Sequence, residues 1–278
     1  MDIPDVTWLL DWVLRLPGRM LEPGARARTL AWATVVCAAL YLVSRWQERQ
    51  FPGQEMILPS LQHEPAQTPT SREPFTAEAG GIVYTIKPLF EYELRGMAVS
   101  YSSARSFADL YHREWEDYLN AKDVAVIWGE NLDSGVYLLL KFSSDSWMAY
   151  VRTKRGAREA WDKFRMNQLS NNHLICADES LQRRLLKIGR GDQIRIKGVL
   201  AEYSHSDGKF RRGSSTTRED TGNGACETIW VEEYELLQPA NVFWRHLKRL
   251  TFWLALLSGV ACLWFYIRAP VVERYTLE

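Results

Sequence analysis

Two apolar runs without a charged residue lie near the ends of the chain. They cover residues 29–44 and residues 250–267. A helix needs about 20 apolar residues to cross the hydrocarbon core of a bilayer, so both runs are at the short end of the usual range. Arginines flank each run directly, and their long side chains can reach the headgroup region. We therefore predict transmembrane helices at residues 29–45 and 250–267.

Positive residues around the first run indicate its orientation. Four arginines lie within residues 15–28, before the run, and two lie within residues 45–49, after it. Because positive residues accumulate on the cytoplasmic side, this bias places both termini in the cytoplasm and the middle of the chain on the far side. The charges around the second run weakly favour the opposite orientation.

Alternating hydrophobic and polar positions predict a small β domain over residues 85–240, and its expected order is a group of strands, a helix and two further strands. A further helix is expected at residues 106–120, after the first strand. Asp178 is placed to cap the main helix. The expected strands cover residues 90–101, 123–129, 135–142, 147–152, 191–203 and 228–237, and the main helix covers residues 178–188.

Three further segments lie outside the β domain and the two apolar runs. Residues 1–28 contain an amphipathic stretch, which fits an interfacial helix, a partner-binding helix or a hairpin against the first span. Residues 46–84 are rich in proline and polar residues, so we expect a semi-extended linker there. Residues 268–278 form a short C-terminal tail.

Composition narrows the class of protein. Lys plus Arg and Asp plus Glu both number 34, so the net charge is zero, which argues against a bulk polyanion binder. Hydrophobic residues make up 46% of the chain, which excludes a mainly disordered protein. Four cysteines exclude a disulfide-dense mini-protein.

The spacing of glycines in the later predicted strands resembles the pattern of a known fold. Residues 191–200 read GDQIRIKGVL, in which glycines punctuate alternating isoleucines. With the order of strands and helix, this pattern resembles the oligonucleotide/oligosaccharide-binding (OB) fold. The resemblance implies an all-β domain with one or two added helices, built as a five-stranded barrel between two transmembrane helices. The block from Asn171 and the loop before the last strand also resemble stretches of uncharacterised bacterial membrane proteins, which implies the bacterial inner membrane with a periplasmic soluble domain.

The polar loop at residues 208–227 is the expected binding site. It combines three arginines with hydroxyl residues and glycines, and such a loop can hold an anion through guanidinium and backbone N–H groups. The alternative is a loop that satisfies its own polar groups. The predicted binding residues are Arg211, Arg212, Arg218, Asn172 and His173.

The sequence offers few candidate residues for catalysis or metal binding. The histidine spacing does not favour a zinc site, and neither a metal nor a cofactor is expected. Cys226 and His173 can form a thiol nucleophile and its base, but no third, orienting group is evident. Alternatively, Cys176 and Cys226 pair as a disulfide that stabilises the domain by about 3–4 kcal/mol, or remain free thiols.

The absence of an evident catalytic set favours a membrane-anchored, non-enzymatic interaction module that presents its domain to a protein partner in an envelope complex. A nucleic-acid or polyanion binder is the less favoured alternative, and it requires three basic clusters to converge on one face. A nuclease-type hydrolase on the barrel, using Asp220, Glu227 and Arg218, is the third.

Overall fold

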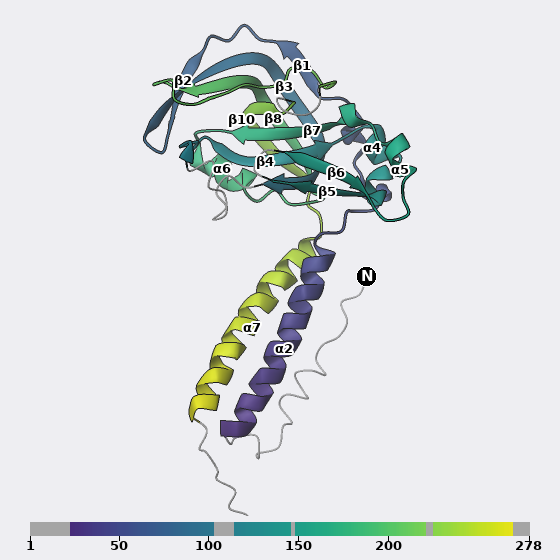
Figure 1. The fold of residues 1–278 in the computed structure, drawn as a ribbon, viewed down its shortest axis with the longest axis vertical. Helices are drawn as coiled ribbons and strands as arrows, with labels where there is room; N and C mark the ends of the chain where they lie inside the picture. Colours follow the sequence, from purple (N-terminus) through teal and green to yellow (C-terminus); the bar gives the residue numbers. More distant parts are fainter. Residues whose placement is uncertain (1–22, 103–113, 146–147, 221–224, 269–278) are drawn as a thin grey trace, which may run out of the picture. The chain divides into compact units, whose positions relative to one another are not determined.

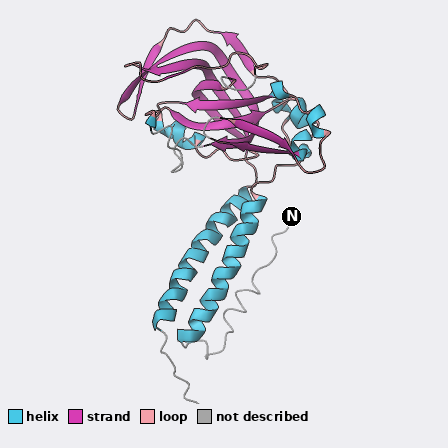
Figure 2. Ribbon diagram, viewed as in Figure 1, coloured by secondary structure: helices cyan, strands magenta, loops and turns pink. Residues whose placement is uncertain are grey.

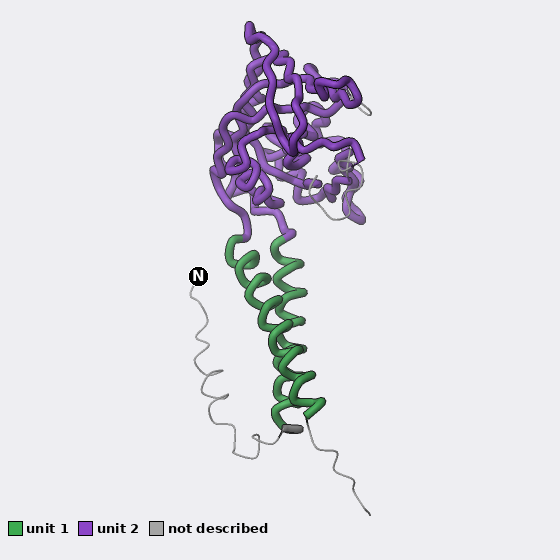
Figure 3. Tube along the Cα trace, turned by 90° about the vertical axis from the view of Figure 1, so that its left-hand side faces the viewer, with its two compact units in different colours: residues 1–48, 242–278 green, residues 49–241 purple. Residues whose placement is uncertain are grey.

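The computed structural model describes residues 23–102, 114–145, 148–220 and 225–268. The chain divides into two compact units, which Figure 3 distinguishes. Unit 1 joins Met1–Glu48 and Val242–Glu278, and unit 2 is Arg49–Asn241.

Unit 1 contains two long helices, α2 (Pro23–Gln47) and α7 (Val242–Arg268) (Figure 1). Both are long and apolar enough to cross a membrane, and few of their residues are buried, unlike those of a core helix. The helices pack against each other, with the Thr34 and Ser258 hydroxyl oxygens 2.9 Å apart. The predicted pair of membrane helices therefore fits a two-pass membrane protein.

Unit 2 consists mainly of strands, with short helices at its edges (Figure 2). Its strands are β1 (Ala66–Pro69), β2 (Phe75–Ala79), β3 (Ile82–Ser102), β4 (Asn120–Ile127), β5 (Leu140–Ser144), β6 (Ala149–Thr153), β7 (Leu169–Ile175), β8 (Gln193–His205), β9 (Arg211–Arg212) and β10 (Glu227–Gln238). Its α-helices are α4 (Glu130–Asp133), α5 (Ala160–Lys163) and α6 (Glu179–Leu185), and its 3₁₀ helices are η2 (Gln54–Met56), η3 (Pro59–Leu61), η4 (Val136–Leu139) and η5 (Met166–Gln168).

Five strands pair in a closed ring. Going round it, β3 pairs with β4, β4 with β7, β7 with β10, β10 with β8, and β8 with β3 again. All these pairs are antiparallel except β7 with β10, which is parallel. Along the chain, α6 lies between β7 and β8. The hairpin of β5 and β6 forms a separate two-stranded sheet.

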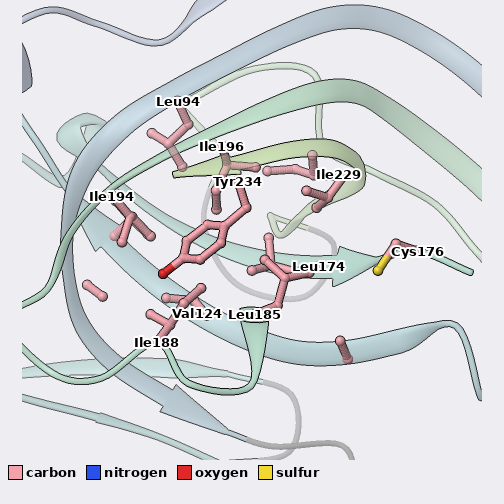
Figure 4. Packing of buried hydrophobic residues seen from close by; sticks show 14 of the residues in the cluster. Leu94, Val124, Leu174, Cys176, Leu185, Ile188, Ile194, Ile196, Ile229 and Tyr234 are labelled. Atoms are coloured by element: carbon pink, nitrogen blue, oxygen red, sulfur yellow. The ribbon is translucent and has the colours of Figure 1, made fainter. Parts of the chain in front are cut away.

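An apolar cluster fills the space between these strands (Figure 4). Tyr234 of β10 contributes to it together with side chains from β3, β4, β7 and β8. Helix α6 adds Leu181 and Leu185, and the Asp178 carboxylate caps this helix by accepting hydrogen bonds from the N–H groups of Ser180 and Leu181. The predicted cap is therefore confirmed, and burial of these side chains supplies the main stabilisation of the ring.

Close contact between β8 and β10 requires a glycine. A Cβ atom on Gly198 would lie 1.9 Å from the carbonyl oxygen of Trp230, which is backbone and cannot move aside cheaply. We expect Gly198→Ala to lower the free energy of unfolding by about 1–3 kcal/mol or more, as overpacking does. Urea unfolding followed by tryptophan fluorescence measures this. Gly213→Ala is the matched control, because nothing lies within 4 Å of its added Cβ; equal stability of the two variants would contradict the prediction.

The third strand of the ring differs from the one expected. Residues 135–142 and 147–152 were expected as consecutive strands of the barrel, but β5 and β6 form their own sheet, and β7 takes the place in the ring. The sequence of β7, LSNNHLI, lacks alternation because six of its seven residues are buried, including Asn172 and His173. Hydrogen bonds offset the free-energy cost of burying these polar side chains.

From Arg49 onward the proline-rich segment is folded into unit 2, which corrects the expected linker at residues 46–84. It contains η2, η3, β1 and β2, and both strands pair with β3. Leu61 is fully buried in a second apolar cluster, which also contains Met97 of β3 and Leu140 of β5, and Phe51, Ile57 and Leu58 pack against this second cluster. These few apolar residues among the prolines hold the segment against the ring.

Three expectations fall on residues outside the described ranges. They are the amphipathic stretch within residues 1–28, most of the helix expected at residues 106–120, and nearly all of the tail at residues 268–278. The last residue of the helix expected at residues 106–120 is described, and there Asn120 belongs to strand β4 instead of a helix.

Candidate functional site

Three neighbouring strands bring together an acid, a histidine and a thiol. Asp123 of β4 is the direct partner of His173 of β7 in their antiparallel register. On the other side of β7, Glu227 is level with Asn172, so Cys226, one residue earlier, is level with Asn171. Because alternate residues of a strand share a face, Asn171, His173 and Cys226 project to the same side of the sheet.

Their side chains form a chain of hydrogen bonds. The Nδ1 atom of His173 lies 2.6 Å from an Asp123 carboxylate oxygen. His173 and Cys226 each shift the pKa of the other through a side-chain hydrogen bond, and since Nδ1 faces Asp123, we infer that Nε2 faces the sulfur. The Asn171 amide donates a further bond to the Cys226 sulfur over 3.4 Å. A thiol, a base and an orienting carboxylate thus follow one another in the order that nucleophilic catalysis uses.

The charges and hydrogen bonds of Asp123, His173 and Cys226 shift the pKa values of the histidine and the thiol. Burial lowers the pKa of His173, but the charge and hydrogen bond of Asp123, with a smaller contribution from Cys226, outweigh it and raise the pKa to about 9. Burial raises the pKa of the Cys226 thiol, yet the hydrogen bond and charge of His173 and the bond from Asn171 lower it overall. Both shifts are in the direction of a thiolate beside an imidazolium, which is the reactive form of a cysteine nucleophile.

A second layer of polar groups holds the carboxylate. The Asn120 amide donates to the same Asp123 oxygen over 2.8 Å. The largely buried Arg212 guanidinium lies 3.8 Å from Asp117, which accepts a 2.6 Å bond from the Tyr203 hydroxyl. Burial raises the pKa of Asp123, but His173 first, and then Arg212 and Asn120, lower it overall. Asp123 therefore remains ionised and fixes the histidine ring.

The thiol lines a cavity, whereas its partners lie behind it. Cys226 is half-buried, while His173 and Asp123 are buried almost completely. The cavity has a volume of about 560 Å³, within the usual range for small-molecule sites. Its walls come from the β5–β6 hairpin, from residues 164–171 and from residues 218–226 without the undescribed positions.

The predicted binding residues separate in the structure. His173 and Arg212 belong to the polar cluster, and Arg218 lines the cavity, where it donates to the Pro65 carbonyl oxygen over 2.9 Å. Arg211 is 72% exposed and pairs with Glu202. Asn172 points to the opposite face of β7 from His173 and donates to Val124 and Ser170. The five residues therefore do not form one contact surface.

Several hydroxyl groups in the described part of the loop bond to other groups of the loop, whereas Arg218 bonds outside it. The Ser215 hydroxyl lies within 2.7 Å of the Thr217 carbonyl oxygen and of an Asp220 carboxylate oxygen. The Thr228 hydroxyl donates to the Gly213 carbonyl oxygen.

The expected disulfide between Cys176 and Cys226 is not formed. Both are free thiols. In the parallel register of β7 and β10, Cys226 is level with Asn171, and Cys176 is five residues further along, which is about 16 Å at about 3.3 Å per residue. A disulfide needs Cα atoms less than about 7 Å apart. Cys176 instead packs in the apolar cluster inside the ring, at the edge of Figure 4.

Asp123 and Asn171 were missed as site residues. Both lie in strands whose neighbours are buried, and a carboxylate in the apolar stretch DVAVIWG is the signal that could have identified Asp123. A buried acid needs a partner, and His173 is that partner. The pairing of β4 with β7, which no local pattern reveals, supplies the contact.

Among the described residues, no cluster of three or more His, Cys, Asp or Glu side chains is arranged to hold a metal ion. Comparison with known proteins gives no significant match to a protein-family model, a curated protein or a solved structure.

Proposed function

We propose that this chain is a membrane-anchored, cysteine-dependent enzyme in which Cys226 is the nucleophile, His173 its base and Asp123 the group that orients the histidine. The observation that carries this proposal is the hydrogen-bonded series from Asp123 through His173 to a thiol on a cavity wall. A buried structural histidine would not need a thiol partner that reaches a cavity.

The chemistry follows from the arrangement. His173 accepts the thiol proton, and Asp123 stabilises the resulting imidazolium and fixes the ring so that Nε2 faces the sulfur. The thiolate attacks an electrophilic atom of a substrate in the cavity and displaces a leaving group, which departs with the proton from His173, so that a covalent intermediate forms. The intermediate is then released to water or to a second substrate, which restores the thiol.

The test compares the rate at which Cys226 reacts with iodoacetamide in the full-length protein and in His173→Gln, at neutral pH. An ordinary thiol is only a few per cent ionised there, so loss of the histidine should slow the reaction by about tenfold. Peptide mass spectrometry measures the rate at Cys226 alone. His205→Gln is the matched control, because His205 is equally buried but lies near Asp207 instead. Equal rates in all three proteins would refute the proposal.

The domain that carries this site is proposed to be an OB-like barrel. Its support is the ring of five strands, the parallel pairing of β7 with β10, and the helix between β7 and β8. The loop between β8 and β10, which ends at Cys226, corresponds to a loop in which OB folds build ligand contacts.

We also propose that the protein spans the bacterial inner membrane twice, with both termini in the cytoplasm and unit 2 in the periplasm. The support is the excess of arginines before the apolar run at residues 29–44, which lies within α2. A reporter that is active only in the cytoplasm, fused after Glu278, should be active. Activity of a periplasm-specific reporter at that position would reverse the orientation without affecting the catalytic proposal.

Partner binding in an envelope complex is the second candidate function. Exposed apolar side chains near the cavity favour it: Met148 and Met166 line its wall, and Trp161 stacks on Phe164 beside them. Capture of a protein partner from detergent-solubilised membranes, retained in Cys226→Ala and lost in Trp161→Ala, would indicate an interaction module without catalysis.

Polyanion binding and nuclease activity receive less support. Several basic residues of the expected clusters are paired with carboxylates, as Arg195 is with Glu93 and Glu233. Of the expected nuclease residues, Glu227 is buried and Asp220 is engaged by Ser215.

A further inference from the structure

The walls of the cavity around Cys226 identify which electrophile fits there. Much of the lining is apolar, including Met148, Ala149, Phe164, Met166 and Leu169. The lining contains two arginines, Arg165 and Arg218, and two carboxylates, Glu219 and Asp220, so its formal charges balance. Arg165 is moreover paired with Glu130 at 2.9 Å. The cavity therefore lacks the excess positive charge that a phosphate or sulfate ester requires.

Redox chemistry with a second thiol also does not fit. Cys176 is the other cysteine of unit 2, and the register of β7 and β10 keeps it about 16 Å from Cys226 along the strands. What remains for a thiolate beside an apolar wall is a carbonyl carbon that carries an aliphatic group.

A hydrogen-bond donor lies where such a carbonyl would need one. Attack on a carbonyl puts negative charge on its oxygen, and a donor close to the nucleophile stabilises this charge. The Asn171 side chain lines the cavity, and its amide nitrogen lies 3.4 Å from the Cys226 sulfur. The β7 strand fixes its backbone, so the amide is positioned before the substrate arrives.

Resting on the proposed function, we propose that the substrate of this site is an acyl donor, an ester or thioester of an aliphatic acid, and that Asn171 binds its carbonyl oxygen. The thiolate attacks the carbonyl carbon, the carbon–leaving-group bond breaks, and the leaving group departs with the proton that His173 had taken from the thiol. Cys226 then carries the acyl group as a thioester, and no oxidant or reductant is needed. The acyl chain lies along Phe164, Met166 and Leu169.

The experiment supplies the full-length, detergent-solubilised protein with 4-nitrophenyl acetate, butyrate and hexanoate. Release of 4-nitrophenol and the mass of the Cys226 peptide are followed. Each methylene buried on the apolar wall should raise kcat/KM by about fourfold, so butyrate should exceed acetate by about fifteenfold. Met166→Gln should reduce this dependence on chain length, whereas Met56→Gln, an exposed methionine elsewhere in unit 2, should not.

The role of Asn171 has its own readout. Asn171→Ala should slow acylation by about a hundredfold, as loss of one oxyanion donor does. Alkylation of Cys226 by iodoacetamide forms no oxyanion, so it should change only a few-fold. An equal loss in both reactions would overturn the assignment of Asn171.

The outcomes separate the two proposals. If Cys226 is alkylated quickly and in a His173-dependent way but no ester acylates it, the substrate class is wrong and the cysteine enzyme stands. Acylation at equal rates for all chain lengths would overturn the aliphatic acyl group. If Cys226 reacts with neither iodoacetamide nor the esters, both proposals fail.

Discussion

Replacing Asp123 with Ala should lower the free energy of unfolding by about 3 kcal/mol, because breaking a buried ion pair leaves its partner uncompensated. Asp123 faces His173 at 2.6 Å, and both side chains are almost fully buried. Urea unfolding of the solubilised protein, followed by tryptophan fluorescence, measures the loss.

The matched control is Asp207→Ala, which removes an exposed carboxylate paired with Lys209 and should cost less than about 1 kcal/mol. Asp123→Asn keeps the size of the side chain and some of its hydrogen bonds, so it should fold more stably than Asp123→Ala. If Asp123→Ala is as stable as Asp207→Ala, the buried pair is not ionised and the account of the site fails.

Stability should also depend on pH through His173. Its pKa is raised from an ordinary 6.5 to about 9, so the folded state binds the proton more tightly than the unfolded state. The stabilisation is therefore complete below about pH 6.5 and is lost as the pH rises through about 9. The loss amounts to about 3 kcal/mol.

This prediction is tested in the Cys226→Ala background, which removes the neighbouring thiol whose own ionisation acts in the opposite direction. The free energy of unfolding of this protein is compared with that of the double variant carrying His173→Gln as well. Burial raises the pKa of Glu227 to about 8, but this group is present in both proteins and cancels. A difference between the two proteins that stays constant over this pH range would contradict the raised pKa of the histidine.

Local patterns in the sequence predict the parts of the fold that local interactions determine. The two apolar runs became α2 and α7, the Asp178 cap begins α6, and the alternating stretches became β3, β8 and β10. Each of these elements shows its periodicity or cap within its own residues.

Elements defined by long-range pairing were not predicted. The β7 strand has no alternation because both of its faces are buried, and the proline-rich segment folds only because β3 offers an edge for β1 and β2. The same limit applied to the site. Cys226 and His173 were recognised as a pair, but their orienting acid lies fifty residues before His173 and meets it only through the register of β4 and β7.

The most direct test of the account is the pH dependence of Cys226 alkylation in the full-length protein. The midpoint of the rate against pH does not depend on how accessible the thiol is. The reference is the ordinary thiol introduced by Lys209→Cys at an exposed site, in the Cys226→Ala background. We predict a midpoint for Cys226 clearly below that reference, which should lie near the usual pKa of about 8.5. A midpoint at or above the reference would show that Cys226 is an ordinary buried thiol, and would contradict the catalytic site.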